Sequence, residues 1–429
     1  MAAEWRHSLF GDVCEHSAFG PRFSSDEYAI DGNVACLRTT DIDGNGRIDF
    51  AAMPLARLDL ARFRNHILQR DDLVITRTGA YLGKAAVFSD FRLPVLPGAF
   101  SIRFRLKRDI ADPLFFRYYF NSRDGQAAIH SIATGSVQPN LNIPNLHSLV
   151  VPLPPLVEQE AIASMIGALD DKIELNRRMN ATLEAMARAR FQSWFVDFDP
   201  VRAKLDGRQL TGLDPVTAAL FPDEFEESEF GSIPKGWRIG KVSDMSSTQY
   251  GYTASATDEP IGPRFLRVMD INKQPWINWS SVPYCNISQD DKARYALFVG
   301  DILVARMADP GKSAIVEQEV DAVFASYLVR LKTESLAHAY YLYYHLKSPA
   351  YGEYSAGAMS GSVQANMNAK VIVAAELVIP PAPILEKFVE TILPLRQQIA
   401  ANLDQSRSLA TIRDTLLPKL LNGQFRIPT

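Results

Sequence analysis

Residues 41 to 50, DIDGNGRIDF, have the residue types and spacing of a calcium-binding EF-hand loop. Such a loop places oxygen ligands at positions 1, 3, 5 and 9, a turn glycine at position 6 and a bidentate Glu at position 12. The ligand positions and the turn are taken here by Asp41, Asp43, Asn45, Asp49 and Gly46. Position 12, however, is Ala52, and the residues before the loop are β-branched and short, as in a strand. Two interpretations follow, a calcium site or the polar tip of a β-hairpin, and we favour the hairpin.

Two further stretches, RTGAYLGKAAV (77–87) and ADPGKSAI (308–315), suggest a phosphate-binding loop but do not fit it. The first has its glycines four residues apart where five are required, and the second has Arg306 in place of the first glycine. The sequence also has no GxGxxG or HExxH motif and no cluster of Cys and His, and its seven histidines are dispersed. We therefore expect no catalytic residue and no metal site in this chain.

The composition is that of an ordinary globular protein with room for two or three domains. The chain has 429 residues, of which 47% are hydrophobic and 22% are charged. No run of eighteen apolar residues and no signal pattern occur, and three scattered cysteines have no disulfide or metal spacing. These features predict a cytoplasmic protein. The net charge of −4 argues only against non-specific coating of DNA, because local basic patches can occur on an acidic protein.

The sequence contains an internal repeat. Five stretches of the first half recur in the second half. They are WRHSLFGDV at Trp5 and WRIGKVSDM at Trp237, LRTTDI at Leu37 and LRVMDI at Leu266, DDLVITR at Asp71 and GDILVAR at Gly300, GSVQPNLN at Gly135 and GSVQANMN at Gly361, and LVVPLPPLVEQE at Leu149 and LVIPPAPILEKF at Leu377. The matches keep their order and a nearly constant separation, which predicts a tandem duplication. The repeat lays DIDGNGRIDF over DINKQPWINW (270–279), which loses the turn glycine and most carboxylates. Both copies keep strand, polar turn and strand, which favours the hairpin interpretation.

Each copy begins with a strand-rich part and ends in a long helix. Strands are expected at 72–78, 85–88 and 100–108 and at 265–271, 301–306, 313–317 and 325–333, with short helices at 111–122 and 335–348. Prolines followed by acidic residues then predict the start of each long helix. The fold class is thus α+β, two mixed, mainly β domains joined by two long helices. We expect domain 1 at 1–152, the first helix at 153–200, a connector with a short helix from Asp214 at 201–232, domain 2 at 233–380, and the second helix with its tail at 381–429.

The two long helices carry a heptad pattern with apolar and a few polar seam positions. The seam consists of Ile162, Ile166, Leu169, Ile173, Asn176, Asn180 and Leu183 and of Leu385, Val389, Ile392, Arg396, Ile399, Leu403 and Ser406. Alternating spacings of three and four predict an antiparallel coiled coil, in which the polar positions fix register. The alternative is two amphipathic helices, each packed on its own domain.

Two similar domains on a spacer suit a ligand with two parts. A helix of about 40 residues is about 60 Å long, which exceeds the ~34 Å of one DNA turn. Residues able to contact phosphates or base edges recur at matched places, and others differ between the copies. The candidate DNA-binding residues are Arg47, Arg77, Thr78, Tyr81, Lys84, Ser136, Gln138 and Asn140, and Tyr250, Tyr252, Lys273, Trp276, Arg306, Lys312, Ser362, Gln364 and Asn366. Alternatively, the shared Gln138 and Asn140 and their counterparts only build a turn into the long helix.

Three stretches carry a family resemblance. FQSWFVDFDPVRAK (191–204), LFPDEFEESEFGSIPKGW (220–237) and LATIRDTLLPKLLNGQFRI (409–427) resemble the specificity subunit of type I restriction–modification systems. The repeats and both proline-led helices fit this family too. The resemblance implies two target-recognition domains in a pseudo-twofold arrangement, each reading one half of a split, asymmetric double-stranded DNA site.

The resemblance also implies partners and cofactors. The paired helices set the gap between the half-sites and dock two methyltransferase subunits, and a restriction subunit that moves along DNA joins this complex. S-adenosylmethionine, ATP and magnesium belong to those partners, and the chain acts in host defence in a prokaryotic cytoplasm. Two other classes stay open: a coiled-coil scaffold for protein-binding β domains without DNA, and an enzyme that cleaves or modifies DNA alone.

Overall fold

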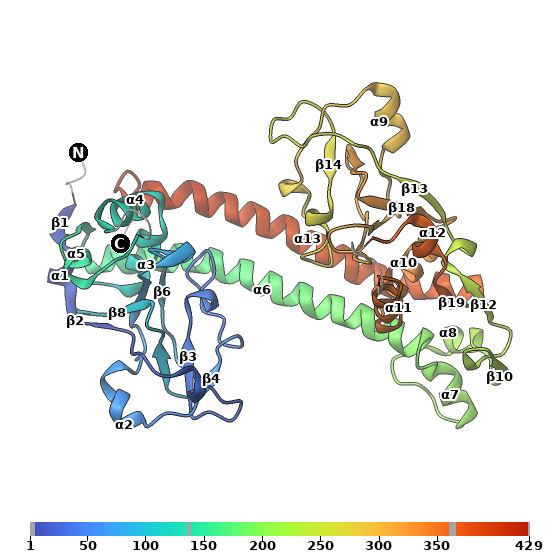
Figure 1. The fold of residues 1–429 in the computed structure, drawn as a ribbon, viewed down its shortest axis with the longest axis horizontal. Coiled ribbons are helices and arrows are strands. Elements are labelled where there is room, and N and C mark those ends of the chain that lie inside the picture. The colour runs from blue at the N-terminus through green and yellow to red at the C-terminus, as the bar shows by residue number, and fades with distance from the viewer. Residues whose placement is uncertain (1–4, 135–138, 360–365, 428–429) are drawn as a thin grey trace. The chain divides into compact units, whose positions relative to one another are not determined.

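The computed structural model describes residues 5–134, 139–359 and 366–427. Contacts divide the chain into two compact units: unit 1 is Met1–Asn176 with Leu403–Thr429, and unit 2 is Arg177–Asn402. The boundaries fall inside the two long helices, α6 (Leu156–Phe195) and α13 (Ala382–Leu421). Each unit therefore holds one β module and half of each long helix, and we call residues 5–153 module 1 and residues 238–379 module 2 (Figure 1).

Module 1 is built on a four-stranded sheet in the order β2-β8-β5-β6, a three-stranded sheet β4-β3-β7 and a strand pair β1-β9. Its strands are β1 (Arg6–Leu9), β2 (Cys14–Phe19), β3 (Val34–Leu37), β4 (Leu55–Ala56), β5 (Leu73–Thr76), β6 (Ala85–Val87), β7 (Val95–Pro97), β8 (Ser101–Leu106) and β9 (Val150–Leu153). Its helices are α1 (Phe10–Val13), α2 (Leu60–Phe63), α3 (Pro113–Asn121), α4 (Arg123–Ile132) and α5 (Ile143–His147). The apolar run of β5 is buried along its whole length because both faces of the sheet are covered.

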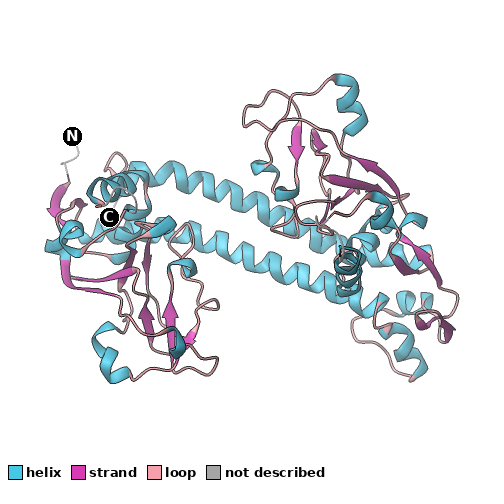
Figure 2. Ribbon diagram, in the orientation of Figure 1, coloured by secondary structure: helices cyan, strands magenta, loops and turns pink. Residues whose placement is uncertain are grey.

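Module 2 repeats this topology except that its described residues have no strand equivalent to β4; both modules combine strands with short helices (Figure 2). Its four-stranded sheet has the order β13-β18-β15-β16, its pair β14-β17 is parallel like β3-β7, and β12-β19 corresponds to β1-β9. The strands are β12 (Arg238–Lys241), β13 (Ser247–Tyr250), β14 (Arg264–Leu266), β15 (Ile302–Ala305), β16 (Ser313–Ile315), β17 (Ala322–Phe324), β18 (Leu328–Lys332) and β19 (Glu376–Ile379). The helices are α9 (Gln289–Tyr295), α10 (Leu336–His345), α11 (Pro349–Met359) and α12 (Ala369–Val373). The α+β class and the tandem duplication are thereby confirmed.

One predicted strand is largely wrong. The stretch 265–271 was expected to be extended, but β14 ends at Leu266 and a 3-10 turn covers Val268–Asp270. The reason is local: the Asp270 carboxylate accepts hydrogen bonds from the backbone N and from Nε of Arg267, at 2.9 and 3.0 Å. The same turn in module 1 has Arg38 bonded to Asp41. This pairing explains why the first acidic position of the calcium-like loop is kept in both copies.

The calcium-like loop itself is a hairpin tip in module 1. Ile42 and Ile48 form an antiparallel bridge, and the backbone N of Asp43 donates to the carbonyl of Arg47 at 2.9 Å. The Asp43 carboxylate accepts from the backbone N of Asn45 and of Arg47 at 2.8 and 2.9 Å. The carboxylates of the loop are therefore used by its own backbone and by Arg38, and the hairpin prediction is confirmed for this copy. For the second copy the prediction is wrong, because residues 271–278 hold a turn and bends but no strand or bridge.

The two long helices run antiparallel within each unit. In unit 1, Asp170 meets Arg413 and Asn176 meets Ser406, so the partner's number falls as the number on α6 rises. In unit 2, Asn180 pairs with Asn402 at 2.8 Å, and Glu184 pairs with Arg396. The antiparallel pairing is confirmed in both units. All fourteen predicted seam residues are buried or half-buried.

The segment between the β modules carries two short helices and a hairpin. These are α7 (Asp199–Leu205), α8 (Pro215–Leu220) and the antiparallel pair β10 (Phe225–Ser228) and β11 (Gly231–Pro234). The Asp214 side chain caps α8 by accepting from the backbone N of Thr217 at 3.0 Å, as expected for a helix that begins there. Among the described residues, no helix has the length and apolar character needed to cross a membrane.

Candidate nucleic-acid interface

An arginine lies on an aromatic ring at one end of the four-stranded sheet of module 1, where β2 and β5 end and β8 begins. Phe19 ends β2 and Arg77 follows β5, and the Arg77 Cζ atom is 4.6 Å from the Phe19 ring centroid. Nε of Arg77 donates to Oδ1 of Asn140 at 3.1 Å. The backbone N of Arg77 donates to the carbonyl of Phe100 at 2.9 Å, and its carbonyl accepts from Leu141 at 2.8 Å. We call Phe19, Arg77 and Phe100 cluster 1.

Module 2 repeats the arrangement with different side chains. Tyr250 ends β13, Arg306 follows β15, and the Arg306 Cζ atom is 5.0 Å from the Tyr250 ring centroid. The backbone N of Arg306 donates to the carbonyl of Tyr327 at 3.0 Å, and its carbonyl accepts from Met367 at 2.8 Å. We call Tyr250, Arg306 and Tyr327 cluster 2.

Both clusters present aromatic rings to solvent. Phe100 is 61% exposed and Tyr327 is 55% exposed, and Phe19 and Tyr250 are exposed as well. On duplex DNA, aromatic rings can make apolar contacts with base edges such as the thymine methyl group, and arginine can bond to phosphates or to guanine. One difference sets the clusters apart: Nε of Arg306 is buried and has no hydrogen-bond partner among the described residues. The clusters thus share a scaffold but offer different contact groups.

Several predicted cations are used inside the protein. Nζ of Lys84 donates to the carbonyl of Gly44 at 2.6 Å, and the Arg47 guanidinium lies 3.4 Å from the Glu174 carboxylate and 3.7 Å from that of Asp171. Thr78 forms a backbone bridge with Asn140, while the side chain of Tyr81 is exposed. Of the predicted residues in module 1, the structure therefore places Arg77 and Asn140 together and Lys84 and Arg47 at the hairpin tip.

The other predicted residues of module 2 lie outside cluster 2. Lys273 and Trp276 line a hollow of about 240 Å³, together with the amide side chains of Gln274 and Asn278. Tyr252 packs on Tyr295, with ring centroids 5.3 Å apart. Lys312 and Asn366 are exposed. Ser136, Gln138, Ser362 and Gln364 lie outside the described residues.

Sequence reasoning missed Phe19, Phe100 and Tyr327. A signal for two of them exists, because Phe100 and Tyr327 stand directly before β8 and β18, which are equivalent strands of the repeat. An aromatic residue at the same strand entrance in both copies, followed by buried residues, marks an exposed ring at a fixed place. Phe19 is recognisable only once its match with Tyr250 at the end of β13 is known.

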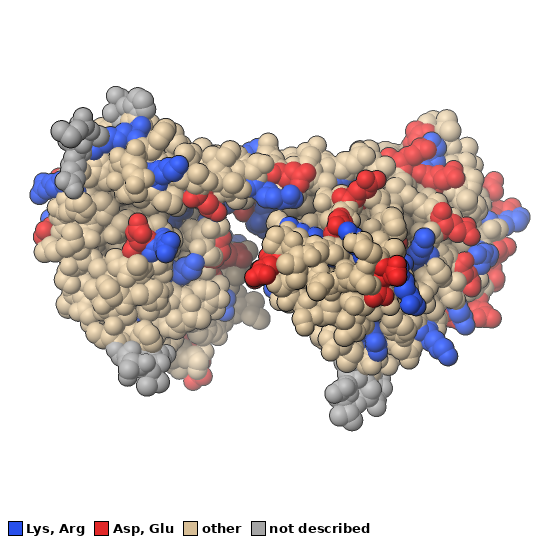
Figure 3. Space-filling model, turned by 90° about the horizontal axis from the view of Figure 1, so that it is seen from above, with Lys and Arg blue, Asp and Glu red and all other residues tan. Residues whose placement is uncertain are grey.

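Charged side chains of both signs occur on one face of the molecule. On the face shown in Figure 3, Lys and Arg are interspersed with Asp and Glu and form no broad basic surface. Below the surface of unit 2, burial lowers the pKa of Lys347 to about 8, and its Nζ atom lies 5.1 Å from the Tyr343 ring centroid.

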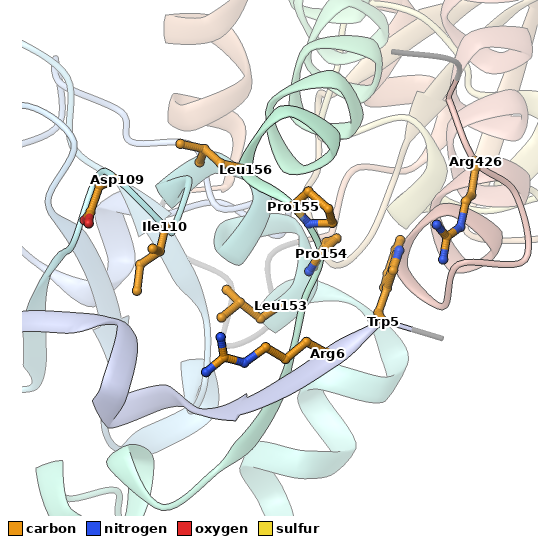
Figure 4. A pocket seen from close by; sticks show the side chains of 9 residues that line it. All are labelled: Trp5, Arg6, Asp109, Ile110, Leu153, Pro154, Pro155, Leu156 and Arg426. Carbon is orange, nitrogen blue, oxygen red and sulfur yellow. The ribbon is translucent and has the colours of Figure 1, made fainter. Parts of the chain in front are cut away.

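A second hollow, of about 390 Å³, lies at the start of α6 in unit 1 (Figure 4). Its walls include Trp5 and Arg6, Leu153 at the end of β9, and Arg426 from the tail. Nε1 of Trp5 donates to the Glu158 carboxylate at 3.2 Å, and Arg426 lies 3.8 Å from the same carboxylate. The hollow thus marks where the strand pair, the long helix and the tail of unit 1 converge.

These features define a class: a duplicated protein in which two like modules, each with an aromatic–arginine surface, are mounted on antiparallel helices. Residues 3–185 match the family model described as Type I restriction modification DNA specificity domain. The chain is 27% identical over 335 residues to the Type I restriction enzyme HindI specificity subunit of Haemophilus influenzae, covering 67% of this chain and 71% of that protein. It is also 27% identical over 321 residues to the MjaIX specificity subunit of Methanocaldococcus jannaschii, covering 73% of this chain and 69% of that one.

The fold has a solved counterpart. The crystal structure of the type I restriction-modification S subunit from M. genitalium superposes with a TM-score of 0.62 at 13% identity, covering 98% of this chain and 96% of that one. In sequence the chain is thus similar to type I restriction–modification specificity subunits, and its first 185 residues carry the match to the family model.

Proposed function

We propose that each module reads one half of a split, asymmetric DNA site, and that clusters 1 and 2 lie at the two reading surfaces. The observation that carries this proposal is the repetition of one backbone arrangement with unlike side chains. Arg77 and Arg306 have matching backbone partners, but their ring partners are Phe19 and Tyr250. A shared scaffold keeps both modules able to approach DNA, while the different side chains favour different bases.

The remaining parts of the proposal concern the partners. The antiparallel helices set the gap between the half-sites and dock two methyltransferase subunits, which reach the target adenine by flipping it out of the duplex. A restriction subunit completes the complex. The chain itself is not catalytic, and S-adenosylmethionine, ATP and magnesium are held by those partners.

Modified-base sequencing of DNA from cells that express this chain with its cognate methyltransferase tests the proposal. We expect a split adenine-methylation motif that is absent from cells with the methyltransferase alone. Phe100→Ala is expected to relax base preference in one half of the motif and Tyr327→Ala in the other. Phe230→Ala, which removes an exposed ring from the β10–β11 turn, serves as the matched control and leaves both halves unchanged.

Two outcomes would contradict the proposal. If the two proteins co-purify but no motif appears, the chain acts as a scaffold without DNA reading. If Phe100→Ala and Tyr327→Ala both leave the motif intact, the clusters are structural and the reading surfaces lie elsewhere in the modules.

A further inference from the structure

The proposed function leaves the calcium-like loop without a role, yet this loop is tightly held against the long helix of unit 1. At its tip, Gly46 approaches the sheet so closely that a Cβ atom there would lie 2.1 Å from the carbonyl oxygen of Ala85. Lys84 donates to the carbonyl of Gly44 from the sheet side. The next residue, Arg47, extends to α6 and meets Glu174 at 3.4 Å and Asp171 at 3.7 Å. The tip therefore connects the sheet of module 1 to the helix.

The equivalent loop of module 2 is also held at its tip, by different chemistry. Pro275 occupies the position of Gly46 in the repeat. Its carbonyl accepts from Oη of Tyr343 at 2.7 Å and from Nη2 of Arg396, on α13, at 3.4 Å. The Arg396 side chain is only 1% exposed and is also paired with Glu184 on α6.

The Arg396 network reaches the sheet as well. Nε of Arg396 donates to Oε1 of Glu317 at 2.6 Å. Glu317 lies two residues after the end of β16. The same carboxylate oxygen accepts from Oη of Tyr340 on α10 at 2.8 Å. In both units, then, the loop after the Arg–Asp turn contacts a long helix: α6 through Arg47 in unit 1, and α13 through the Pro275 carbonyl in unit 2. In unit 1 the contact is ionic and partly exposed, since Asp171 is 88% exposed, and in unit 2 it is buried.

We propose that the loops 42–48 and 271–277 are matched joints that fix each β module on its helix pair and thereby restrict the gap lengths that the protein accepts in DNA. A module that tilts on its helices displaces its reading surface, so the spacing between half-sites depends on these joints as well as on helix length. Arg47 and Tyr343 act as positioning residues and read no base. This inference rests on the proposed function.

Arg47→Gln tests the joint of unit 1. The assembled complex of this chain and its methyltransferase is given a DNA library with the native half-sites and a randomised gap, and methylation is read by modified-base sequencing. We expect methylation at gaps one base pair longer or shorter to rise about two- to fivefold relative to the native gap, the range of an exposed ion pair. Arg57→Gln is the matched control, because Arg57 pairs with the exposed Asp31 in the same module, away from the joint.

Tyr343→Phe tests the joint of unit 2 with a minimal change. It removes the hydroxyl that donates to Pro275 and keeps the ring, so the module is expected to fold. Loss of one hydrogen bond predicts a rise of about two- to tenfold in off-gap methylation. Tyr354→Phe is the control, because its hydroxyl also donates to a backbone carbonyl of module 2, that of Val371 at 2.7 Å, outside the joint.

The outcomes separate this inference from the proposed function. Broader gap tolerance with unchanged half-sites in Arg47→Gln and Tyr343→Phe, and in neither control, supports the joints. If Arg47→Gln changes the base preference but not the accepted gap, Arg47 reads DNA. If the variants change neither the gap nor the motif, the loops do not position the modules. Either result overturns the inference. Absence of any motif with the unaltered protein instead contradicts the proposed function.

Discussion

Arg413 on α13 donates from Nη1 to the carboxylate of Asp170 on α6 at 2.8 Å, inside unit 1. Oη of Tyr118, on α3, donates to the other oxygen of the same carboxylate at 3.0 Å. Asp170 is 3% exposed, so one buried carboxylate joins both long helices to module 1. None of these three residues belongs to the predicted seam, although they pair across it.

Removing this carboxylate should destabilise unit 1 strongly. Asp170→Ala leaves the Arg413 guanidinium without its buried partner, and breaking such a pair costs about 3 to 5 kcal/mol. Urea unfolding of the purified chain measures the loss. Asp404→Ala is the control, because Asp404 pairs with Arg407 at the surface, and its loss should cost less than about 1 kcal/mol. Equal effects of the two substitutions would refute the structural role of Asp170.

The asparagine pair of unit 2 predicts non-additive effects. Nδ2 of Asn402 donates to Oδ1 of Asn180 at 2.8 Å, and both side chains are buried. Asn180→Leu alone removes the Asn180 acceptor of the buried Asn402 amide and should cost about 1 to 3 kcal/mol, whereas replacing both residues by Leu should recover part of that loss. The double variant should also lose register, because one buried polar pair excludes alternative alignments. A double-mutant cycle measured by urea unfolding checks this pairing. If the losses in free energy of unfolding of the two single variants simply add in the double variant, the pairing is contradicted.

Acid should weaken unit 2 through His345. Burial lowers the pKa of His345 to about 4, below its ordinary value of 6.5. Between pH 6.5 and 4 the unfolded chain binds a proton that the folded chain does not. The free energy of unfolding therefore decreases as the pH is lowered through this range, by about 3 kcal/mol at most. Above pH 6.5 the effect is absent. Urea unfolding at pH 7.5 and 5 should show this loss, and His345→Gln should reduce it, while His7→Gln, at an exposed histidine, should not.

Two glycines with left-handed backbones should respond differently to substitution. Gly46 and Gly79 have φ of +73° and +81°. Alanine costs about 1 to 2 kcal/mol in this conformation. A Cβ at Gly79 meets nothing within 4 Å, but one at Gly46 clashes with the Ala85 backbone, which adds about 1 to 3 kcal/mol. The melting temperature of Gly46→Ala should therefore be well below that of Gly79→Ala. Equal melting temperatures would show that the hairpin tip is not packed on the sheet.

The repeat and the helices could be predicted because their signals are local or periodic. The long helices follow from prolines, acidic first turns and heptads, and Asp214 is a recognisable cap for α8. The strand order could not be predicted, since β2 pairs with β8 and β1 with β9 across more than eighty residues. The turn at Val268–Asp270 was missed because its cause, the Arg267–Asp270 pair, looks the same in a sequence as any surface charge pair.

The candidate site shows the same division. Arg77 and Arg306 were selected because they recur, and the structure finds both on aromatic rings. Arg47 was selected because it differs between the copies, but its charge is directed at α6. A difference between copies is thus an ambiguous signal, since the two modules differ both where ligands are read and where each module is attached. Only the tertiary contacts distinguish these cases.

The division of the chain at Asn176 and Leu403 also has a consequence for synthesis on the ribosome. Unit 2 is one continuous segment, whereas unit 1 includes Leu420 and Leu421, which are buried in the same core as Phe10 and Phe116. Unit 2 can therefore be completed while unit 1 still lacks part of its core, although module 1 is translated first. During that interval the place of the last helix half is open apolar surface, so the nascent chain is most exposed to chaperones and to misassembly with a second chain at its oldest end.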